Sequence, residues 1–347
     1  MMRLPYFRYH APRTVGEAAK ILAGEGPQAM PIAGGTDLLP NMKRRHQVPT
    51  TLVALRGLAS LREIHNGSGI RLGAGLTLTD LIRDSNVSGS YAGLWQAAAQ
   101  VATPHLRNMG TLGGNLCLDT RCTYYDQNYE WRRAIDFCMK KDGDTCWVAP
   151  SSARCLAVSS TDTAPALISL GAKVRLVSTD GEREVVLDDL YNNDGIDYQR
   201  RLPHELLTEV VLEPAHGWKS TYWKLRRRGA FDFPVLSVAA AARLDPEGVV
   251  EQARLVLGAV ASRPLSAPDA VSFLEGKKLT DDTIAEAASR AVKLAKPMDN
   301  TDFTLHWRKR VATQFVTYAL AELRGDDMRE RRRRIARHEL ETAPTCS

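Results

Sequence analysis

The fold is decided by two polar segments, Thr111-Leu112-Gly113-Gly114-Asn115 and Thr161-Asp162-Thr163-Ala164-Pro165. Five of the six cysteines of the chain lie between them. Clustered cysteines in a reducing compartment are metal ligands or redox groups more often than disulfides. The two polar segments therefore predict a nucleotide-type cofactor site, and the stretch between them predicts a metal centre.

A second pair of glycines lies nearer the N-terminus, in Ala33-Gly34-Gly35-Thr36-Asp37-Leu38. The apolar residues 29–33 predict a strand before it, and residues 38–45 predict a helix after it. Glycines permit positive φ and a close approach of the backbone, so that successive N–H groups can point at one anion. A plain tight turn is the alternative for this pair alone. With the loop predicted over residues 103–115, it predicts two loops that bind the two ends of a pyrophosphate.

The composition is typical of a globular protein, with 44% hydrophobic and 25% charged residues. No run approaches the roughly 18 apolar residues of a membrane span, and the N-terminus shows no apolar signal region. The sequence therefore predicts a cytoplasmic protein with no membrane partner.

The formal net charge is +6, and much of the excess lies in Arg329-Glu330-Arg331-Arg332-Arg333-Arg334. This run predicts a solvated helix end, a disordered tail or a contact with an acidic partner. No helix-turn-helix, zinc-finger spacing or interleaving of aromatic and basic residues indicates nucleic acid. We therefore expect no nucleic-acid partner.

Turn signals divide the chain into units. We predict units over residues 1–57, 58–218 and 219–325 and a basic tail over 326–347, with a cysteine-rich insert at about 117–157 in the second unit. Residues 173–177 and 183–187 predict a hairpin, because Asp-Gly stands between them.

Capping signals and apolar spacing predict the helices. Thr14 with Glu17 three residues later predicts a helix start, and Asp162 with Pro165 behind it predicts another. Apolar spacing predicts helices over residues 283–295 and 308–323.

The cysteines of the insert follow no C-x-x-C spacing, so no zinc-ribbon or ferredoxin pattern is present. Four thiolates can still converge from an irregular loop, and such sites select zinc or an iron–sulfur cluster. Cys117 fits a packed apolar position, and Cys346 is the penultimate residue. The candidate ligands are then Cys122, Cys138, Cys146 and Cys155, with scattered thiols as the alternative.

Aromatic residues of the insert are expected to shield such a centre from water. They are Tyr124, Tyr125, Tyr129, Trp131, Phe137 and Trp147.

Several motifs stand in order along the chain. Besides Ala33 to Leu38 they are Gly73-Ala74-Gly75-Leu76-Thr77, Arg107-Asn108-Met109-Gly110-Thr111-Leu112-Gly113-Gly114-Asn115-Leu116, Asp162-Thr163-Ala164-Pro165-Ala166-Leu167, Glu205-Leu206-Leu207-Thr208-Glu209-Val210, Lys224-Leu225-Arg226-Arg227-Arg228 and Phe231-Asp232-Phe233-Pro234-Val235. Together they resemble the FAD-binding medium subunits of molybdenum hydroxylases, which include carbon monoxide dehydrogenase and the flavin portion of xanthine dehydrogenase.

The resemblance implies an α+β fold. It would be a PCMH-type (vanillyl-alcohol-oxidase-like) FAD-binding fold of two α/β subdomains, followed by a C-terminal α+β domain of the CO dehydrogenase flavoprotein type. Ordinary members lack the cysteine insert. An insert with four cysteines at this place resembles the β subunit of 4-hydroxybenzoyl-CoA reductase, where it holds a 4Fe–4S cluster.

The same resemblance implies the site residues. The residues carried over to FAD are Ala29, Met30, Pro31, Ile32, Ala33, Gly34, Gly35, Thr36, Val101, Thr111, Gly113, Gly114, Asn115, Asp162, Leu207 and Lys224. The residues carried over to the cluster are Cys122, Cys138, Cys146 and Cys155. From the residues alone, Asp162 could equally be a plain helix cap and Lys224 a surface cation on a strand.

The implied function is electron transfer, with no catalytic residue on this chain. Electrons would pass from a ferredoxin through the 4Fe–4S cluster and FAD to 2Fe–2S and molybdenum centres. Those centres would lie on a small and a large partner subunit, in a heterotrimer dimerised to a heterohexamer. The whole complex would remove the hydroxyl of 4-hydroxybenzoyl-CoA reductively in anaerobic aromatic degradation. Two alternatives remain: a stand-alone FAD oxidoreductase with a structural four-cysteine zinc site, and a basic zinc-binding interaction module.

Overall fold

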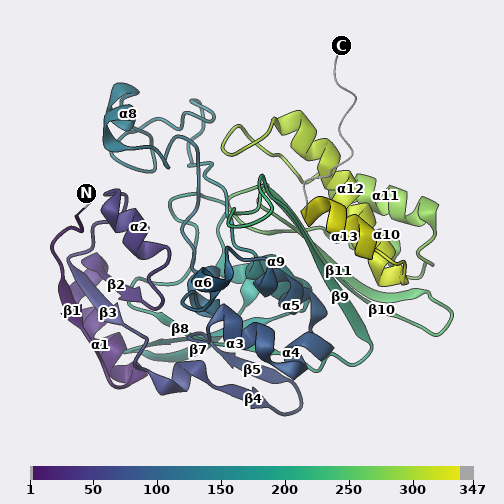
Figure 1. The fold of residues 1–347 in the computed structure, drawn as a ribbon, viewed down its shortest axis with the longest axis horizontal. Helices are drawn as coiled ribbons and strands as arrows, with labels where there is room; N and C mark the ends of the chain where they lie inside the picture. The colour runs from purple at the N-terminus through teal and green to yellow at the C-terminus, as the bar shows by residue number, and fades with distance from the viewer. Residues whose placement is uncertain (1–2, 337–347) are drawn as a thin grey trace.

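The structure is a computed structural model that describes residues 3–336 (Figure 1). It contains β-sheets of three, five and four strands, which pack against helices. The first two sheets are built before residue 213, and the third is built from residues 218–266. This mixture of helices with largely antiparallel sheets confirms the expected α+β class.

The N-terminal sheet is small and parallel, with the strand order β1-β3-β2. Its strands and helices are β1 (Arg8–His10), α1 (Val15–Glu25), η1 (Gly26–Gln28), β2 (Ala29–Ile32), α2 (Leu38–Lys43) and β3 (Thr51–Ala54). As predicted, Thr14 caps α1, because its hydroxyl accepts a hydrogen bond from the N–H of Glu17 at 3.1 Å. The predicted strand, glycine turn and helix are confirmed, and they place Gly34 and Gly35 just after β2.

The five-stranded sheet is antiparallel, with the order β4-β5-β8-β6-β7. Its strands are β4 (Ile64–Asn66), β5 (Ile70–Gly73), β6 (Lys173–Ser178), β7 (Gly181–Val186) and β8 (Leu206–Leu212). The accompanying helices are η2 (Ala59–Arg62), α3 (Leu78–Arg83), α4 (Ser85–Ser90), α5 (Ala92–Ala99), α6 (Pro104–Arg107), α7 (Leu112–Leu116), α9 (Thr163–Ser169) and η3 (Leu187–Leu190). The predicted hairpin is confirmed as β6–β7. One apolar core joins α5, α7 and α9, so the two polar segments at the starts of α7 and α9 become neighbours.

The C-terminal sheet is antiparallel, with the order β12-β11-β10-β9. Its elements are β9 (Trp218–Leu225), β10 (Leu236–Leu244), β11 (Val250–Gly258), β12 (Leu265–Ser266), α10 (Pro268–Leu274), α11 (Asp281–Ala291) and α12 (Leu305–Arg324). The two helices predicted here are confirmed with shifted ends, whereas α10 was not predicted. The first strand, β9, also packs on α5, which brings this sheet against the core that joins α5, α7 and α9.

The cysteine-rich insert extends from the middle of the molecule towards α2 (Figure 1). Its helix is α8 (Tyr129–Ala134), which Asn128 caps through a 2.9 Å hydrogen bond from the N–H of Trp131. The insert is therefore mostly irregular, as its sequence indicated, and it is held by side-chain contacts rather than by long elements.

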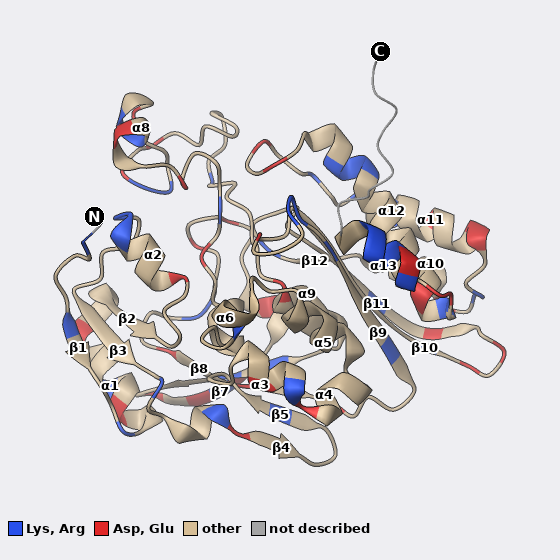
Figure 2. Ribbon diagram, in the orientation of Figure 1, with Lys and Arg blue, Asp and Glu red and all other residues tan. Residues whose placement is uncertain are grey.

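The arginine-rich run forms helix α13 (Arg329–Ala336), on which basic and acidic residues lie close together (Figure 2). Arg332 makes a 2.6 Å ion pair with Glu322 of α12, lies 4.1 Å from the ring of Trp223 and donates to Gln96 of α5 at 3.1 Å. The disordered-tail interpretation is wrong for residues 329–336, whereas the predicted solvated helix end is confirmed, because α13 has no buried residue. Within this exposed helix, the cation–π contact of Arg332 with Trp223 ties α13 to the C-terminal sheet. Residues 337–347, with Cys346, lie outside the described part. No helix within residues 3–336 is long and apolar enough to cross a membrane.

We expect Arg332→Met to lower the free energy of unfolding by about 1–3 kcal/mol, since hydrogen bonds to charged groups contribute in this range. Burial opposes ionisation of Glu322, but bonds from Arg332 outweigh it and hold the pKa of that carboxyl below its usual value. A lowered carboxyl pKa adds stability at neutral pH that is lost as the pH falls. The difference in free energy of unfolding between wild type and Arg332→Met should therefore shrink below about pH 4.5. Urea unfolding at pH 7 and pH 4 measures it.

The matched control is Arg334→Met, because Arg334 makes only a 3.4 Å contact with Glu330 and is exposed. Its effect should stay within about 0.5 kcal/mol. Equal effects of the two variants would contradict the anchoring role of Arg332.

Candidate functional site

The two glycine segments lie against each other. A Cβ added at Gly34 would stand 1.8 Å from the carbonyl oxygen of Met109, and one at Gly110 would stand 3.5 Å from Oγ1 of Thr36. Gly35 has φ +70°, in the left-handed region that glycine adopts without strain. The turn after β2 and the turn after α6 therefore touch backbone to backbone, which larger residues at Gly34 would prevent.

The second glycine segment is a helix start rather than the predicted loop. Gly113 and Gly114 lie in α7, and the hydroxyl of Thr111 caps it by accepting from the N–H of Gly114 at 3.1 Å. Thr103 caps α6 in the same way. The glycines predict a loop because of their low helix propensity, but a threonine cap before each short helix outweighs it.

Asn115 ties α7 to the second polar segment. Its buried side-chain oxygen accepts from the hydroxyls of Thr161 and Thr163, at 2.8 and 2.7 Å, and from the N–H of Thr163 at 3.0 Å. Thr111, Asn115 and Asp162, which are distant in sequence, are thus held in one polar region.

Asp162 and Lys224 form a buried ion pair at this region. Lys224 Nζ lies 3.0 Å from Asp162 Oδ2 and 3.0 Å from the carbonyl of Gln100, and the Tyr222 hydroxyl donates to Asp162 Oδ1 at 2.7 Å. Burial raises the pKa of Asp162 and lowers the pKa of Lys224, although each partner opposes the other's shift. Lys224 is 3% exposed, so the surface-cation alternative is wrong. Asp162 precedes α9 but its carboxylate does not cap it.

The other predicted cofactor residues lie on three further elements, β2, the end of α5 and β8. Residues 29–32 form β2, where Ala29 is buried in a core, so this strand would meet a cofactor through its backbone or the turn behind it. Val101 follows α5 and is half-buried, and Leu207 on β8 is buried; both pack on the core that joins α5, α7 and α9. Val101 and Leu207 thus share the core of α7 and α9, whereas the residues of β2 pack in two other apolar clusters.

Ser160 is a residue that the sequence did not single out. It is 2% exposed, and its hydroxyl has no hydrogen-bond partner within the described chain. It stands beside Thr161, which binds Asn115. An unpaired buried hydroxyl costs about 1–3 kcal/mol, so a hydroxyl or phosphate of a bound dinucleotide would fit here. The only signal in the sequence was its place in the polar run 159–163.

The four candidate metal ligands are all buried. Cys122, Cys138 and Cys155 share one apolar cluster with Tyr125, and Cys146 is 4% exposed. All of them are free thiols. Cys117 is also free but packs on the neighbouring core, as expected.

Burial raises the pKa of the Cys122 thiol to about 12 and that of Cys155 to about 11. Thiolates in this place would therefore need a bound cation. One tetrahedral zinc ion needs its sulfur atoms about 3.8 Å apart, given Zn–S bonds of about 2.3 Å. No group of three or more His, Cys, Asp or Glu side chains within residues 3–336 is arranged to hold one metal ion.

The aromatic cover is only partly as expected. Tyr125 is buried, whereas Tyr129, Trp131 and Trp147 are exposed. Tyr129 lies against Phe137, with ring centroids 5.6 Å apart. The exposed rings therefore lie on the outer surface of the insert, and Tyr125 is the one that is buried in the same apolar cluster as the thiols.

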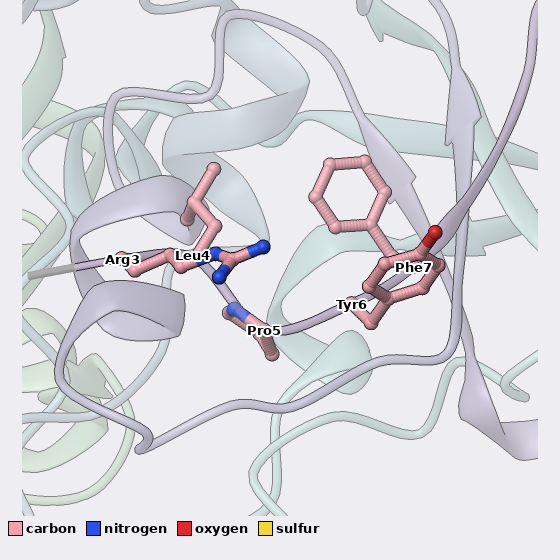
Figure 3. Close-up of a pocket in the computed structure, with 5 residues that line it drawn as sticks. All are labelled: Arg3, Leu4, Pro5, Tyr6 and Phe7. Carbon is pink, nitrogen blue, oxygen red and sulfur yellow. The ribbon is translucent and has the colours of Figure 1, made fainter.

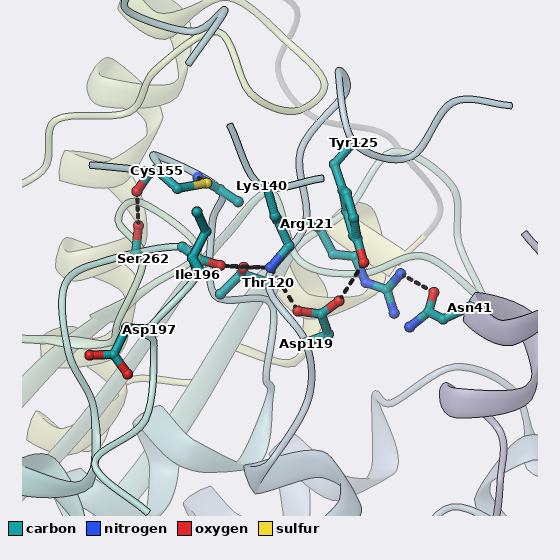
Figure 4. Close-up of polar contacts among 12 residues, drawn as sticks. Asn41, Asp119, Thr120, Arg121, Tyr125, Lys140, Cys155, Ile196, Asp197 and Ser262 are labelled. Atoms are coloured by element: carbon teal, nitrogen blue, oxygen red, sulfur yellow. Dashed lines mark hydrogen bonds and ion pairs between the residues drawn. The ribbon is translucent and has the colours of Figure 1, made fainter. Parts of the chain in front are cut away.

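A buried polar network fixes the base of the insert (Figure 4). Lys140 Nζ lies 2.8 Å from Asp119 Oδ1 and donates to the carbonyl of Gly195 at 2.6 Å, and Tyr125 donates to the other oxygen of Asp119 at 2.9 Å. On the far side, Asn300 donates to the carbonyl of residue 156 at 2.6 Å. The insert is thus held by both neighbouring domains.

A hollow of about 470 Å³ lies elsewhere, along the N-terminal arm (Figure 3). It is lined by Arg3, Leu4, Pro5, Tyr6 and Phe7. None of these belongs to the glycine turns or to the cysteine cluster, so the hollow lies apart from the predicted cofactor and metal residues.

Comparison with known proteins accounts for both halves of the chain. The model of the FAD binding domain in molybdopterin dehydrogenase matches residues 5–214, and that of the CO dehydrogenase flavoprotein C-terminal domain matches residues 220–323. The aldehyde oxidoreductase FAD-binding subunit of Escherichia coli is 33% identical, over 91% of this chain and 99% of its own length.

Solved structures show the same relationship. Carbon monoxide dehydrogenase from Hydrogenophaga pseudoflava is 28% identical, covers 92% of this chain and 97% of its own, and has a TM-score of 0.76. Quinoline 2-oxidoreductase from Pseudomonas putida 86 is 26% identical over 93% and 98%, with a TM-score of 0.74. This chain therefore belongs to the molybdenum hydroxylase family, of the carbon monoxide dehydrogenase and xanthine dehydrogenase kind, as an FAD-binding medium subunit.

Proposed function

We propose that this chain carries both FAD and a 4Fe–4S cluster and transfers electrons within a molybdenum-containing reductase complex. A ferredoxin-like donor would supply single electrons, which pass through this chain towards 2Fe–2S and molybdenum centres on partner subunits. The observation that carries the proposal is the burial of four free cysteines in an insert between two elements of the FAD region. The chain supplies position and electrostatics, and the bound cofactors supply the redox chemistry.

For FAD, we assign the pyrophosphate to the turn of residues 29–36 and to the start of α7 at residues 111–115. The close contact of Gly34 with Met109 and the unpaired hydroxyl of Ser160 support this placement. Val101, Leu207 and the Asp162–Lys224 pair would lie nearer the flavin. The buried pair would hold its charges fixed there, because water cannot screen it.

For the cluster, we assign Cys122, Cys138, Cys146 and Cys155 as ligands. Soft thiolates select iron–sulfur clusters or zinc, and a four-iron cluster separates its thiolates more widely than one zinc ion does. A stand-alone FAD oxidoreductase with a structural four-cysteine zinc site is the alternative. The resemblance of the insert to that of the 4-hydroxybenzoyl-CoA reductase β subunit supports the cluster over zinc.

For the complex, we propose a molybdenum-cofactor large subunit and a 2Fe–2S small subunit, in a heterotrimer that dimerises. The overall reaction would be the reductive dehydroxylation of 4-hydroxybenzoyl-CoA to benzoyl-CoA, since the insert resembles that of the corresponding reductase. The free thiols support a reducing location such as the cytoplasm. The substrate proposal is tested by adding 4-hydroxybenzoyl-CoA and a reduced one-electron dye to the purified complex and measuring benzoyl-CoA. Turnover of an aldehyde or of carbon monoxide instead would show that the complex has a different substrate.

We expect Cys138→Ser to lose the cluster and to keep FAD, because Cys138 lies in the insert and FAD is held by other elements. Anaerobic purification followed by counts of iron, acid-labile sulfide and flavin measures this. Cys117→Ser is the control, since Cys117 packs on the core outside the thiol cluster and should keep both cofactors. Zinc alone in the wild type would end the cluster proposal, and loss of both cofactors together in Cys138→Ser would make the insert structural.

A further inference from the structure

Arg121 stands where the insert leaves the FAD region. It directly precedes Cys122 and forms a β-bridge with Val158, with backbone bonds of 2.8 and 2.7 Å between the two residues. The two ends of the insert are therefore joined at Arg121. Its side chain is 10% exposed, so the guanidinium is largely desolvated and its direction is fixed by its partners.

Two of those partners belong to the first glycine segment and the helix after it. The guanidinium forms an ion pair with Asp37, which follows Gly34-Gly35-Thr36. It also donates to Oδ1 of Asn41 in α2 at 3.1 Å (Figure 4). A third partner, Asp126 at 3.5 Å, belongs to the insert itself. Asn41 in turn donates to Asp37 at 3.1 Å. Arg121 thus connects the proposed cluster ligand that follows it, Cys122, with the turn that we assign to the FAD pyrophosphate.

Two further observations concern the surroundings of the Arg121 guanidinium. The ring of Phe233, from the loop between β9 and β10, lies 5.0 Å from the guanidinium. One donor of Arg121, its Nε–H, is buried and has no partner within residues 3–336. Buried donors of native proteins are satisfied in the great majority of cases, so this donor is one that a bound group could satisfy.

The charges suggest what Arg121 does. Asp37 carries a negative charge next to the turn where an anionic pyrophosphate would lie, and like charges at short range in a protein repel strongly. The guanidinium neutralises Asp37 and fixes the turn at the same time. The backbone of Arg121 is adjacent to Cys122, so a cofactor bound to the Cys122 thiol would also hold Arg121 in place.

We propose that Arg121 is a positioning residue that couples the two cofactor sites, so that occupancy of the cysteine site tightens FAD binding and FAD favours occupancy of the cysteine site. The inference rests on the proposed function for the second cofactor. Binding free energies are reciprocal, so both effects have one magnitude. We expect FAD to bind about tenfold more tightly when the cysteine site is occupied than when it is empty.

The test is the FAD dissociation constant of the full-length chain with its accompanying subunits, as purified anaerobically and after removal of iron by a chelator. Wild-type affinity should fall about tenfold on iron removal. In Arg121→Met we expect affinity at least tenfold weaker than wild type and no further change on iron removal. Arg121→Lys, which keeps the charge but offers fewer donors, should recover part of the coupling.

A double-mutant cycle separates coupling from general damage. Asp37→Asn removes the charge that Arg121 neutralises, so the double variant Asp37→Asn with Arg121→Met should bind FAD better than Arg121→Met alone. Arg243→Met is the control, because Arg243 makes an exposed 2.6 Å pair with Glu251 in the C-terminal sheet. It should retain wild-type affinity and iron dependence.

Iron dependence that persists unchanged in Arg121→Met would overturn the inference, as would additive losses in the cycle. If Arg121→Met does not fold, Asp37→Asn alone must still lose the iron dependence. A wild type that never contains iron or sulfide would end the proposed function and this coupling together. A wild type with cluster and FAD that bind independently would end the coupling alone.

Discussion

Gly34→Ala is expected to yield a protein without FAD and with a free energy of unfolding lowered by about 3 kcal/mol, the upper range for overpacking. The added Cβ would stand 1.8 Å from the oxygen and 2.5 Å from the carbon of the Met109 carbonyl. Both atoms are backbone, so no side chain can rotate away, and the turns around Gly34 and Met109 must separate. FAD is proposed to bind across these turns. The flavin-to-protein ratio and urea unfolding measure the two effects.

Gly16→Ala is the matched control for this substitution. Gly16 lies in α1, where an added Cβ would meet nothing within 4 Å. Alanine is the better helix former, so the control should be as stable as wild type or more stable by up to about 1 kcal/mol. A Gly34→Ala protein that retains full flavin would show that the two turns can separate without harm to the site.

The Gly34 contact also shows how far the sequence could be read. The strand, the glycine pair and the helix after it follow from local signals, and all three were predicted correctly. The partner of Gly34 is Met109, far along the chain, and no local pattern encodes that approach. The second glycine pair was misread for another reason: Thr111 signals a helix cap, but glycines were given more weight than the cap.

Buried charge was the least predictable feature. Lys224 looked equally like a surface cation, because the alternation of a strand does not say which face meets another domain. Arg332 looked like part of a solvated run, yet its place is set by Trp223 and Glu322. The cysteines show the same limit: their position predicted the ligand candidates, but sequence spacing in an irregular insert does not give the distances between thiols.

Lys224→Met is expected to lower the free energy of unfolding by about 3–5 kcal/mol, because it leaves the carboxylate of Asp162 buried without its cation. Both groups are almost fully buried, so solvent does not screen the loss. Asp162→Asn added to Lys224→Met should recover most of this stability, since the amide can still accept from Tyr222. Urea unfolding of the two variants measures the difference.

The pH dependence of Lys224→Met has a defined sign. Burial already raises the pKa of Asp162 above 3.8 in the wild type, against the pull of Lys224, and loss of the cation raises this pKa further. A carboxyl with a raised pKa in the folded state binds more protons there than in the unfolded state, so stability falls as the pH rises. The deficit of Lys224→Met should therefore be smallest near pH 4 and grow towards pH 7. A deficit that is constant with pH would mean that lost packing, not the stranded carboxylate, explains it.

The double variant also separates the two roles of the pair. If Asp162 and Lys224 only join α9 to β9, restored stability should restore FAD binding as well. If they lie at the flavin, as we propose, the double variant should be stable but should still bind FAD more weakly than wild type, because two fixed charges have been removed from the site. Stability and flavin affinity measured on the same preparations therefore decide between a structural tie and a cofactor contact.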